Sequence, residues 1–374
     1  MVKQVSPGSS INKRADELGP APSDMQRMGT TLIDYGGGPA PAGAFWLALD
    51  DYSTPIYKYA EEHDGQGWVD RQPKAYFFPT AWSLAAGSAG NVAPGTLVPD
   101  NLAWVGGTGN DNIMLVERDS TGEMWAFWMV RQMAINCVDI FNYPGPSFQN
   151  LGAGILWKNP THTAAGCSLL TNVYKPVSGD DMFERGNGMK QRELMVTVDE
   201  MLEGEIRHAV QLTLTNTWFS EGPANQGKPG IDYFAPARRC EWDRARSIPT
   251  REGHVFPTDK SKLTVHGLRI RFLLTPTERN RWLDRNVGRS KTPFREFCRI
   301  YLNALCDYGM VTTDTGHWGM LSQFDGVLGP AGPKYNKHFG IDRTKTAGFA
   351  KQKAVFSKFM VEFRDRVQVV APAS

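Results

Sequence analysis

Short apolar runs, separated by clusters of glycine, proline and polar residues, begin near residue 45 and recur to the end of the chain. Runs of this length between turn residues are typical of β-strands. Two consecutive runs are apolar on both faces, and the Asp-Ser-Thr-Gly segment between them resembles a hairpin turn. They therefore predict central strands of a β-sandwich. The predicted strands are 44–49, 56–59, 113–117, 125–131, 206–218, 268–274 and 359–370.

Two segments follow a helical pattern instead. Residues 198–204 follow Thr197, which together with Glu200 forms a capping-box signature. Residues 293–308 have a threonine before them, a proline in the first turn, an apolar stripe of helical period and Gly309 as a stop signal. We predict a helix at each segment.

The chain divides into two parts. Residues 1–43 are rich in proline and glycine and poor in apolar residues, which predicts an extended anchoring arm with at most a short helix near 23–28. Residues 44–374 predict one mainly β domain, a jelly-roll (concanavalin-like) sandwich with a few decorating helices. Within it, residues 310–313 and 318–321 are expected to pair as a hairpin.

Composition narrows the class of protein. Of 374 residues, 41% are hydrophobic and 21% charged, so the chain can build a full core. The net charge of +2 supplies no broad footprint for nucleic acid or an anionic membrane. No apolar run reaches the ~18 residues of a membrane span. Five cysteines without a paired spacing favour reduced thiols, and no signal peptide is recognised at the amino terminus.

The run 206–218 carries the most informative polar residues. Alternation along a strand places His208 in an apolar row, where it is either a hydrogen-bonded core histidine or a catalytic base. Glu205, Arg207 and Gln211 lie on the opposite row, which fits a carbohydrate-binding face and equally a solvated one. On the first interpretation, Arg207→Ala weakens glycan binding with little loss of stability. For a buried histidine, His208→Ala costs about 1–3 kcal/mol.

A second candidate binding group lies on the predicted strand 125–131. Aromatic rings stack on sugars, and a nearby guanidinium can hold a carboxylate or sulfate. Trp125, Trp128 and Arg131 supply these groups. Core packing accounts for the aromatic residues at least as well.

Other catalytic signatures are absent from the sequence. No histidine or cysteine motif predicts a metal site, no glycine-rich loop carries a phosphate-binding lysine, and no G-x-S-x-G nucleophile motif occurs. We expect neither a metal nor a cofactor. Glu117, Asp119 and Glu123 flank the predicted hairpin and offer the carboxylates that glycoside hydrolysis requires. A lyase would instead need a base, an acid and a group that neutralises the substrate carboxylate, for which His208, a tyrosine such as Tyr233, and Arg207 or Arg131 are candidates.

Four stretches of the chain together resemble a family of largely uncharacterised bacterial proteins. That family has a G-x-I-x-H-A strand, a later P-A step, a G-x-R-x-R strand and a helix ending L-x-x-Y-G. The corresponding stretches are 192–209, 234–238, 266–271 and 305–310. The resemblance spans about residues 50–325 and implies a jelly-roll sandwich related to lectins and polysaccharide-active enzymes. It identifies no catalytic residue, and the segment 277–289 is an insertion relative to the family pattern.

The family is mostly secreted, whereas this chain carries an arm where a secretion signal would stand. A glycan-handling domain with an anchoring arm is typical of a bacteriophage particle component. We therefore expect a virion-associated tail, fibre or capsid decoration protein, made in the host cytoplasm. It would dock on other virion proteins through residues 1–43 and bind host-surface polysaccharide. The alternatives are a polysaccharide lyase or glycoside hydrolase, and a structural protein with no ligand. Whether it forms a homo-oligomer stays open.

Overall fold

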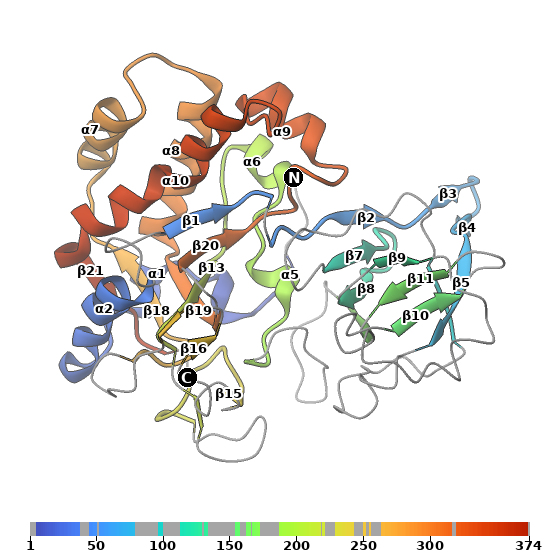
Figure 1. Cartoon of the computed structure of the whole chain (residues 1–374), viewed down its shortest axis with the longest axis horizontal. Helices are drawn as coiled ribbons and strands as arrows, with labels where there is room; N and C mark the ends of the chain where they lie inside the picture. Colours follow the sequence, from blue (N-terminus) through green and yellow to red (C-terminus); the bar gives the residue numbers. More distant parts are fainter. Residues whose placement is uncertain are drawn as a thin grey trace.

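The chain forms a larger lobe of helices packed on a sheet and a smaller lobe made of strands (Figure 1). A computed structural model describes most of the chain. The described residues are 5–37, 45–50, 52–78, 96–99, 113–128, 131–133, 154–157, 162–165, 167–172, 187–217, 219–220, 229–242, 250–251, 254–255, 263–315 and 319–372.

A six-stranded mixed sheet organises the larger lobe, with strand order β1-β20-β13-β19-β18-β21. The pairs β1/β20 and β13/β19 are parallel, and the other neighbours are antiparallel. At each edge of the sheet, the two paired strands are therefore far apart in the sequence: β1 pairs with β20, and β21 pairs with β18. The bounds are β1 Phe45–Ala48, β20 Gly319–Gln323, β13 Val210–Leu214, β19 Met310–Thr315, β18 Arg269–Phe272 and β21 Val367–Val369.

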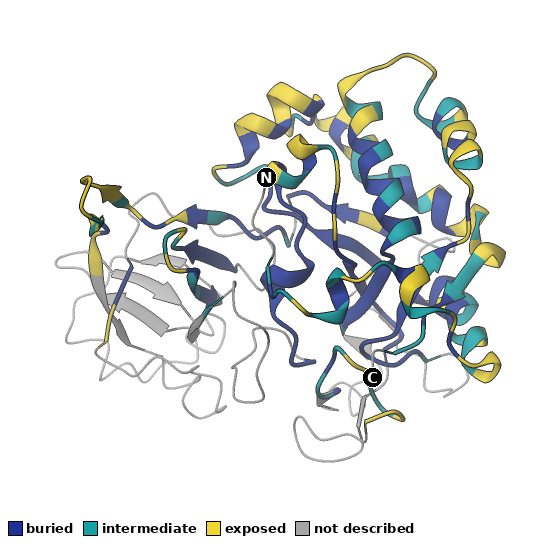
Figure 2. Ribbon diagram, turned by 180° about the vertical axis from the view of Figure 1, so that it is seen from behind, coloured by how far each residue is buried: buried dark blue, intermediate teal, exposed yellow. Residues whose placement is uncertain are grey.

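Helices cover one face of this sheet and enclose the main core. Burying each large apolar side chain here contributes roughly 1.5–3 kcal/mol, and Trp282, Tyr301, Phe356 and Phe359 form a cluster of contacting rings. The outer faces of the helices are exposed, as Figure 2 shows. The helices are α1 Ala15–Leu18, α2 Ser23–Gly36, α5 Gln191–Leu194, α6 Val198–Glu203, α7 Pro276–Asn286, α8 Pro293–Asp307, α9 Gly332–Phe339 and α10 Thr346–Glu362, with 3₁₀ turns at Ser10–Asn12 and Arg364–Arg366.

The second face of the sheet is also covered. Ile11 packs with Ala209 and Val311 in a small apolar cluster, and its carbonyl accepts the Ala209 N–H at 2.9 Å. The Asn187 side chain donates to the Thr312 carbonyl at 3.3 Å. The amino-terminal segment and the residues around α5 therefore seal the face that the helices leave open.

The smaller lobe contains two sheets and a projecting hairpin. One sheet has the order β12-β8-β7-β2 and the other β6-β5-β10-β11-β9, while β3 and β4 form the hairpin. The bounds are β2 Ile56–Lys58, β3 Glu61–His63, β4 Trp68–Asp70, β5 Lys74–Phe78, β6 Leu97–Pro99, β7 Met114–Glu117, β8 Glu123–Trp128, β9 Arg131–Met133, β10 Gly154–Trp157, β11 His162–Ala165 and β12 Cys167–Asn172. Short pairs elsewhere are β14 Phe219–Ser220 with β15 Glu241–Trp242, and β16 Thr250–Arg251 with β17 His254–Val255.

The described part of the predicted arm is not extended. Residues 5–37 contain two helices that pack on their own chain, and Leu32 is fully buried in the main core. The Arg269 guanidinium donates to the Ser10 and Lys13 carbonyls at 2.8 and 2.6 Å. Pro20 forms an antiparallel bridge with Val370 at the edge of the sheet. The sequence prediction missed this packing because the few apolar residues of the segment lie on helix faces.

The local predictions had mixed outcomes. The helices at 198–204 and 293–308 are confirmed as α6 and α8, and the hairpin turn at 119–122 joins β7 to β8. The hairpin of 310–313 with 318–321 is wrong, because β13 lies between β19 and β20. The strand at 359–370 is wrong in most of its length, because α10 extends to Glu362, a 3₁₀ turn follows at Arg364–Arg366, and only Val367–Val369 is a strand. A sheet-rich fold is present, but its six- and four-stranded sheets are mixed and its helices form a whole layer.

Candidate functional site

A cleft of about 560 Å³ lies between the four-stranded sheet of the smaller lobe and helices α5, α6 and α9. In Figure 1, α6 and α9 occupy the side of the larger lobe that is nearest to β2. Five carboxylates and three cationic groups are among the described residues that line it. The lining residues are Ile56, Lys58, Glu117, Asp119, Arg192, Thr197, Val198, Asp199, Glu203, Asp325, Pro330, Ala331 and Lys334.

A buried ion-paired group forms part of the floor of the cleft. Glu117 is 1% exposed, and its carboxylate lies 3.4 Å from the Lys58 ammonium and 3.6 Å from Arg192 Nε. The parallel register of β2 and β7 places Lys58 opposite Glu117. Burial disfavours the charged form of Glu117, but the charges of Arg192 and Lys58 outweigh burial and lower its pKa. The floor therefore holds an ionised carboxylate already neutralised by two cations.

Asp325 is the second buried carboxyl group of the floor. It accepts the Val198 N–H at 3.1 Å, at the first turn of α6, and the Tyr335 hydroxyl from α9 at 2.8 Å. Burial raises the pKa of Asp325 to about 7, although both hydrogen bonds act in the opposite direction. Asp325 thus ties α6 to α9 and carries a carboxyl group that titrates near neutrality.

We expect Asp325→Asn to change how stability depends on pH. A folded-state pKa of about 7 exceeds the ordinary 3.8, so wild-type stability falls as pH rises between these values. The asparagine variant keeps acceptors for Val198 and Tyr335 without ionising. When pH is raised from about 5 to about 8, the difference in unfolding free energy between the asparagine variant and wild type should therefore shift by roughly 1–3 kcal/mol in favour of the variant.

Urea unfolding at the two pH values measures this difference. Tyr335→Phe is the matched control. It removes a hydrogen bond that lowers the Asp325 pKa, so its stability should fall more steeply with pH than that of wild type. A constant difference between Asp325→Asn and wild type would show that Asp325 does not titrate in this range.

Two exposed ion pairs form opposite rims of the cleft. On the smaller lobe, the Lys58 ammonium lies 2.7 Å from the Asp119 carboxylate, and their side chains are 55% and 57% exposed. On the larger lobe, Lys334 of α9 lies 2.6 Å from Asp199 of α6, with side chains 50% and 49% exposed. Exposed pairs of this kind contribute about 0–1 kcal/mol each to stability. Their charges thus remain accessible to a ligand at little cost to the fold.

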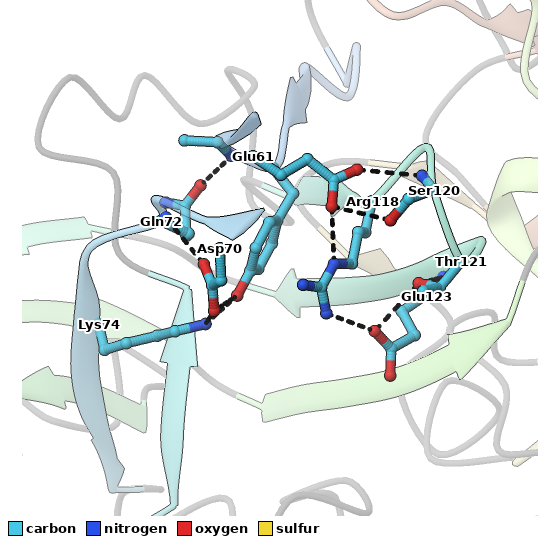
Figure 3. Close-up of polar contacts among 10 residues, drawn as sticks. Glu61, Asp70, Gln72, Lys74, Arg118, Ser120, Thr121 and Glu123 are labelled. Atoms are coloured by element: carbon cyan, nitrogen blue, oxygen red, sulfur yellow. Dashed lines mark hydrogen bonds and ion pairs between the residues drawn. The ribbon is translucent and has the colours of Figure 1, made fainter. Parts of the chain in front are cut away.

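A polar cluster beside the cleft orders the turn that carries Asp119. Glu61 of the β3–β4 hairpin accepts hydrogen bonds from Arg118 Nε at 2.9 Å and from the Ser120 backbone and hydroxyl at 3.0 and 2.8 Å (Figure 3). Arg118 also donates to Glu123 at 3.2 Å. Because Asp119 lies between Arg118 and Ser120, this clamp holds it at the rim.

The remaining contacts in Figure 3 join the β3–β4 hairpin to the rest of the smaller lobe. Tyr59 donates to Asp70 at 2.8 Å, and Lys74 donates to the Tyr59 hydroxyl and pairs with Asp70 at 3.0 Å. Gln72 accepts the Ala60 N–H at 2.7 Å. These polar groups bond to one another, so we assign the cluster a supporting role and place the candidate site in the cleft.

His208 lies outside the cleft lining and is buried. Its Nε2 is 3.1 Å from the Glu200 carboxylate, and its Nδ1 is 2.8 Å from the Ala209 carbonyl. Both partners are acceptors, so the arrangement suits a doubly protonated imidazolium. Burial opposes that charge, but Glu200 outweighs it and raises the pKa of His208, while His208 helps to lower the pKa of buried Glu200 to about 2. This geometry supports the core interpretation over the catalytic one.

The predicted polar face of Glu205, Arg207 and Gln211 does not exist as one surface. Strand β13 begins at Val210, so Glu205 and Arg207 precede it and form an exposed ion pair at 2.9 Å. Gln211 is 1% exposed and donates to Thr213. The prediction failed because period-two alternation identifies the two faces of a strand but not what covers them, and here both faces are covered.

The aromatic candidates are only partly described. Trp125 is half-buried and stacks on Tyr59 with ring centroids 5.4 Å apart, inside a small apolar cluster. The side chains of Trp128 and Arg131 lie outside the described residues. Their backbones belong to β8 and β9, which are strands of different sheets. The packing of Trp125 supports the core interpretation of this residue.

Sequence reasoning missed most of the cleft. It singled out Glu117 and Asp119, but not Arg192 as a partner of Glu117, nor Asp199 and Asp325 as further acids of the lining. In the part of the chain that the structure describes, no three His, Cys, Asp or Glu side chains gather as a metal site would require. The helices among those same residues are too short or too polar to span a membrane. No family model, curated protein or solved structure matches this chain.

Proposed function

We propose that the chain is a glycan-binding protein and that the cleft between its lobes is the binding site. The observation that carries this proposal is an open cleft of about 560 Å³ lined by charged groups of both signs. Ligand sites commonly measure ~300–1,000 Å³, and a short saccharide fits this volume. Its hydroxyl groups can both donate to carboxylates and accept from ammonium groups.

Binding is favoured over catalysis because of the state of Glu117. A general base or nucleophile must reach the substrate and have a suitable pKa. Glu117 is buried, paired with two cations and has a lowered pKa. The other carboxylates that could serve a hydrolase are Asp119, Asp199 and Glu203, and each is paired with a cation.

Glycoside hydrolysis is the second candidate, and Asp325 is the observation in its favour. A carboxyl group with a pKa of about 7 is protonated often enough at neutral pH to act as a general acid. In such a reaction Asp325 would give its proton to the departing glycosidic oxygen, and water would add to the anomeric carbon and lose a proton to a rim carboxylate, Asp119 or Asp199. Release of reducing ends from a bound oligosaccharide, abolished by Asp325→Asn, would establish this alternative.

The proposed biological setting is a bacteriophage particle, where the protein would bind host-surface polysaccharide. A jelly-roll arrangement is proposed for the smaller lobe, which contains two β-sheets. Residues 5–37 pack on their own sheet, so docking on another virion protein would use the exposed side of α2, where Tyr35 is 41% exposed. A purely structural role without a ligand is the outcome if no saccharide binds.

Calorimetric titration with a panel of neutral tetrasaccharides tests the proposal. The panel is tetra-N-acetylchitotetraose, cellotetraose and maltotetraose. We expect at least one to bind, and we expect Lys58→Ala combined with Lys334→Ala to weaken it by about tenfold, or 1.4 kcal/mol. These substitutions remove one hydrogen-bond donor from each rim.

The double variant Arg299→Ala, Arg364→Ala is the matched control, because both are exposed, ion-paired cations outside the cleft lining. It should bind as wild type does. Binding lost in Arg207→Ala and retained in the lysine variant would move the site to the Glu205–Arg207 surface that the sequence suggested.

A further inference from the structure

The charges that line the cleft indicate which class of saccharide it takes. Glu117, Asp119, Asp199, Glu203 and Asp325 contribute five carboxyl groups, against the three cations Lys58, Arg192 and Lys334. All three cations already lie within 4 Å of a carboxylate of the lining. The described lining therefore has an excess of acidic groups, even when Asp325 is neutral.

The accessible acids are placed at both ends of the binding volume. Asp119 is 57% exposed on one rim and Asp199 is 49% exposed on the other. Each carboxylate has two oxygens and several lone pairs, and its lysine partner occupies only some of them. Each rim can therefore accept a further hydrogen bond from a cationic donor without losing its existing ion pair.

An anionic saccharide would have to break the ion pairs at the rims in order to bind. Its carboxylate or sulfate would have to displace Asp119 from Lys58 or Asp199 from Lys334, and would leave the displaced aspartate close to a second negative charge. The remaining cation, Arg192, is 6% exposed and faces Glu117. The floor thus offers an incoming anion no accessible positive charge.

We propose that the cleft selects saccharides that carry free amino groups, with the ammonium groups bound by Asp119 on one rim and Asp199 on the other. This inference rests on the proposed glycan-binding function and names its ligand class. It also accounts for the clamp from Glu61 to Arg118 and Ser120, which holds the turn on which Asp119 lies.

Three tetrasaccharides that differ in charge test the inference. They are chitotetraose, tetra-N-acetylchitotetraose and tetragalacturonate, which are cationic, neutral and anionic. Titrations run at about pH 6, where amines of sugars are largely protonated and galacturonate is ionised. Ionic strength is kept near 0.02 M so that charge effects are weakly screened. We expect chitotetraose to bind about fivefold or more tighter than its N-acetylated form, and tetragalacturonate to bind most weakly.

The double variant Asp119→Asn, Asp199→Asn removes the negative charge of each rim and keeps the size of the side chains. It should bind chitotetraose and its N-acetylated form equally well. The double variant Asp16→Asn, Asp365→Asn is the control for net charge, because both are exposed aspartates outside the cleft lining. It should leave the preference of the wild type unchanged.

The outcomes separate the two proposals. Equal binding of the cationic and neutral sugars by wild type, or tightest binding of tetragalacturonate, would overturn the amino-sugar inference and leave glycan binding in place. A preference that persists in the double variant would overturn the assignment to Asp119 and Asp199. Absence of binding by all three sugars, and by the neutral panel, would overturn the glycan-binding proposal itself.

Discussion

Replacing His208 with alanine should lower the free energy of unfolding by about 3–5 kcal/mol, because it leaves the Glu200 carboxylate, whose side chain is only 13% exposed, without its charged partner. Glu200 also accepts from the Thr197 N–H at 3.0 Å and forms the capping box of α6. The loss therefore exceeds the 1–3 kcal/mol expected for a single buried hydrogen bond. Chemical denaturation followed by circular dichroism measures it.

Arg207→Ala provides the control for this substitution at the neighbouring position. Arg207 is exposed, so its removal should change stability very little. A double-mutant cycle with Glu200→Gln isolates the pair, since His208→Ala should cost less once the carboxylate is gone. A stable His208→Ala variant that had lost a catalytic activity would contradict the structural role and restore the catalytic interpretation.

The contribution of the His208–Glu200 pair to stability should also depend on pH in a defined direction. The pKa of His208 is raised above its ordinary 6.5, so its contribution is complete below that value and is lost as pH rises through the raised pKa. The pKa of Glu200 is lowered from 4.5 to about 2, so its contribution is complete above 4.5 and is lost toward pH 2. The stability difference between wild type and His208→Ala should therefore be largest between about pH 4.5 and 6.5 and smaller at alkaline pH.

A second large effect is expected for Gly267→Ala. Gly267 has φ of +77°, and a Cβ atom there would lie 1.8 Å from the Phe234 carbonyl oxygen. Backbone atoms cannot move aside as a flexible side chain can. The left-handed conformation costs about 1–2 kcal/mol and the overlap roughly 1–3 kcal/mol more. We expect a loss of roughly 2–5 kcal/mol in thermal or chemical denaturation.

Gly204→Ala separates the two contributions. Gly204 has φ of +85°, but no neighbouring atom lies within 4 Å of the position that a Cβ would take. It should therefore show the conformational cost alone, about 1–2 kcal/mol. Equal losses in the two variants would mean that Phe234 and Gly267 are not in close contact.

This contact gives a physical reason for two of the sequence motifs. Gly267 belongs to the stretch 266–271 and Phe234 to the stretch 234–238, and the Phe234 N–H donates to the His266 carbonyl at 2.9 Å. A glycine is required there because the two backbones touch. The motifs are thus explained by packing, and the family resemblance stays a prediction.

Features of the fold that depend on residues close together in the sequence could be predicted, because helix caps leave a recognisable sequence pattern. Caps at Thr197 and Thr292 marked α6 and α8 correctly. Helix α7 was missed although Thr275 and Glu278 form a capping box, because its buried residues Trp282 and Leu283 are adjacent and show no helical period. A proline after Thr275 could have revealed it.

Pairings between distant segments could not be predicted. Strand β13 separates β19 from β20, and nothing in residues 310–321 indicates that another strand will enter between them. The cleft has the same origin, since Lys58, Asp199 and Asp325 come together only when both lobes are folded. A single acid such as Glu117 was visible in the sequence, but its two cationic partners were not.

The bridge between Pro20 and Val370 has a consequence for engineering the chain. The Ala21 N–H donates to the Val369 carbonyl at 2.9 Å, and the Ala371 N–H donates to the Gly19 carbonyl at 3.0 Å. These bonds tie the segment just before α2 to the strand at the edge of the six-stranded sheet. A truncation that removes residues 367–372 would therefore take away an edge strand and also the backbone partners of residues 19–21, so a shortened chain should keep this segment.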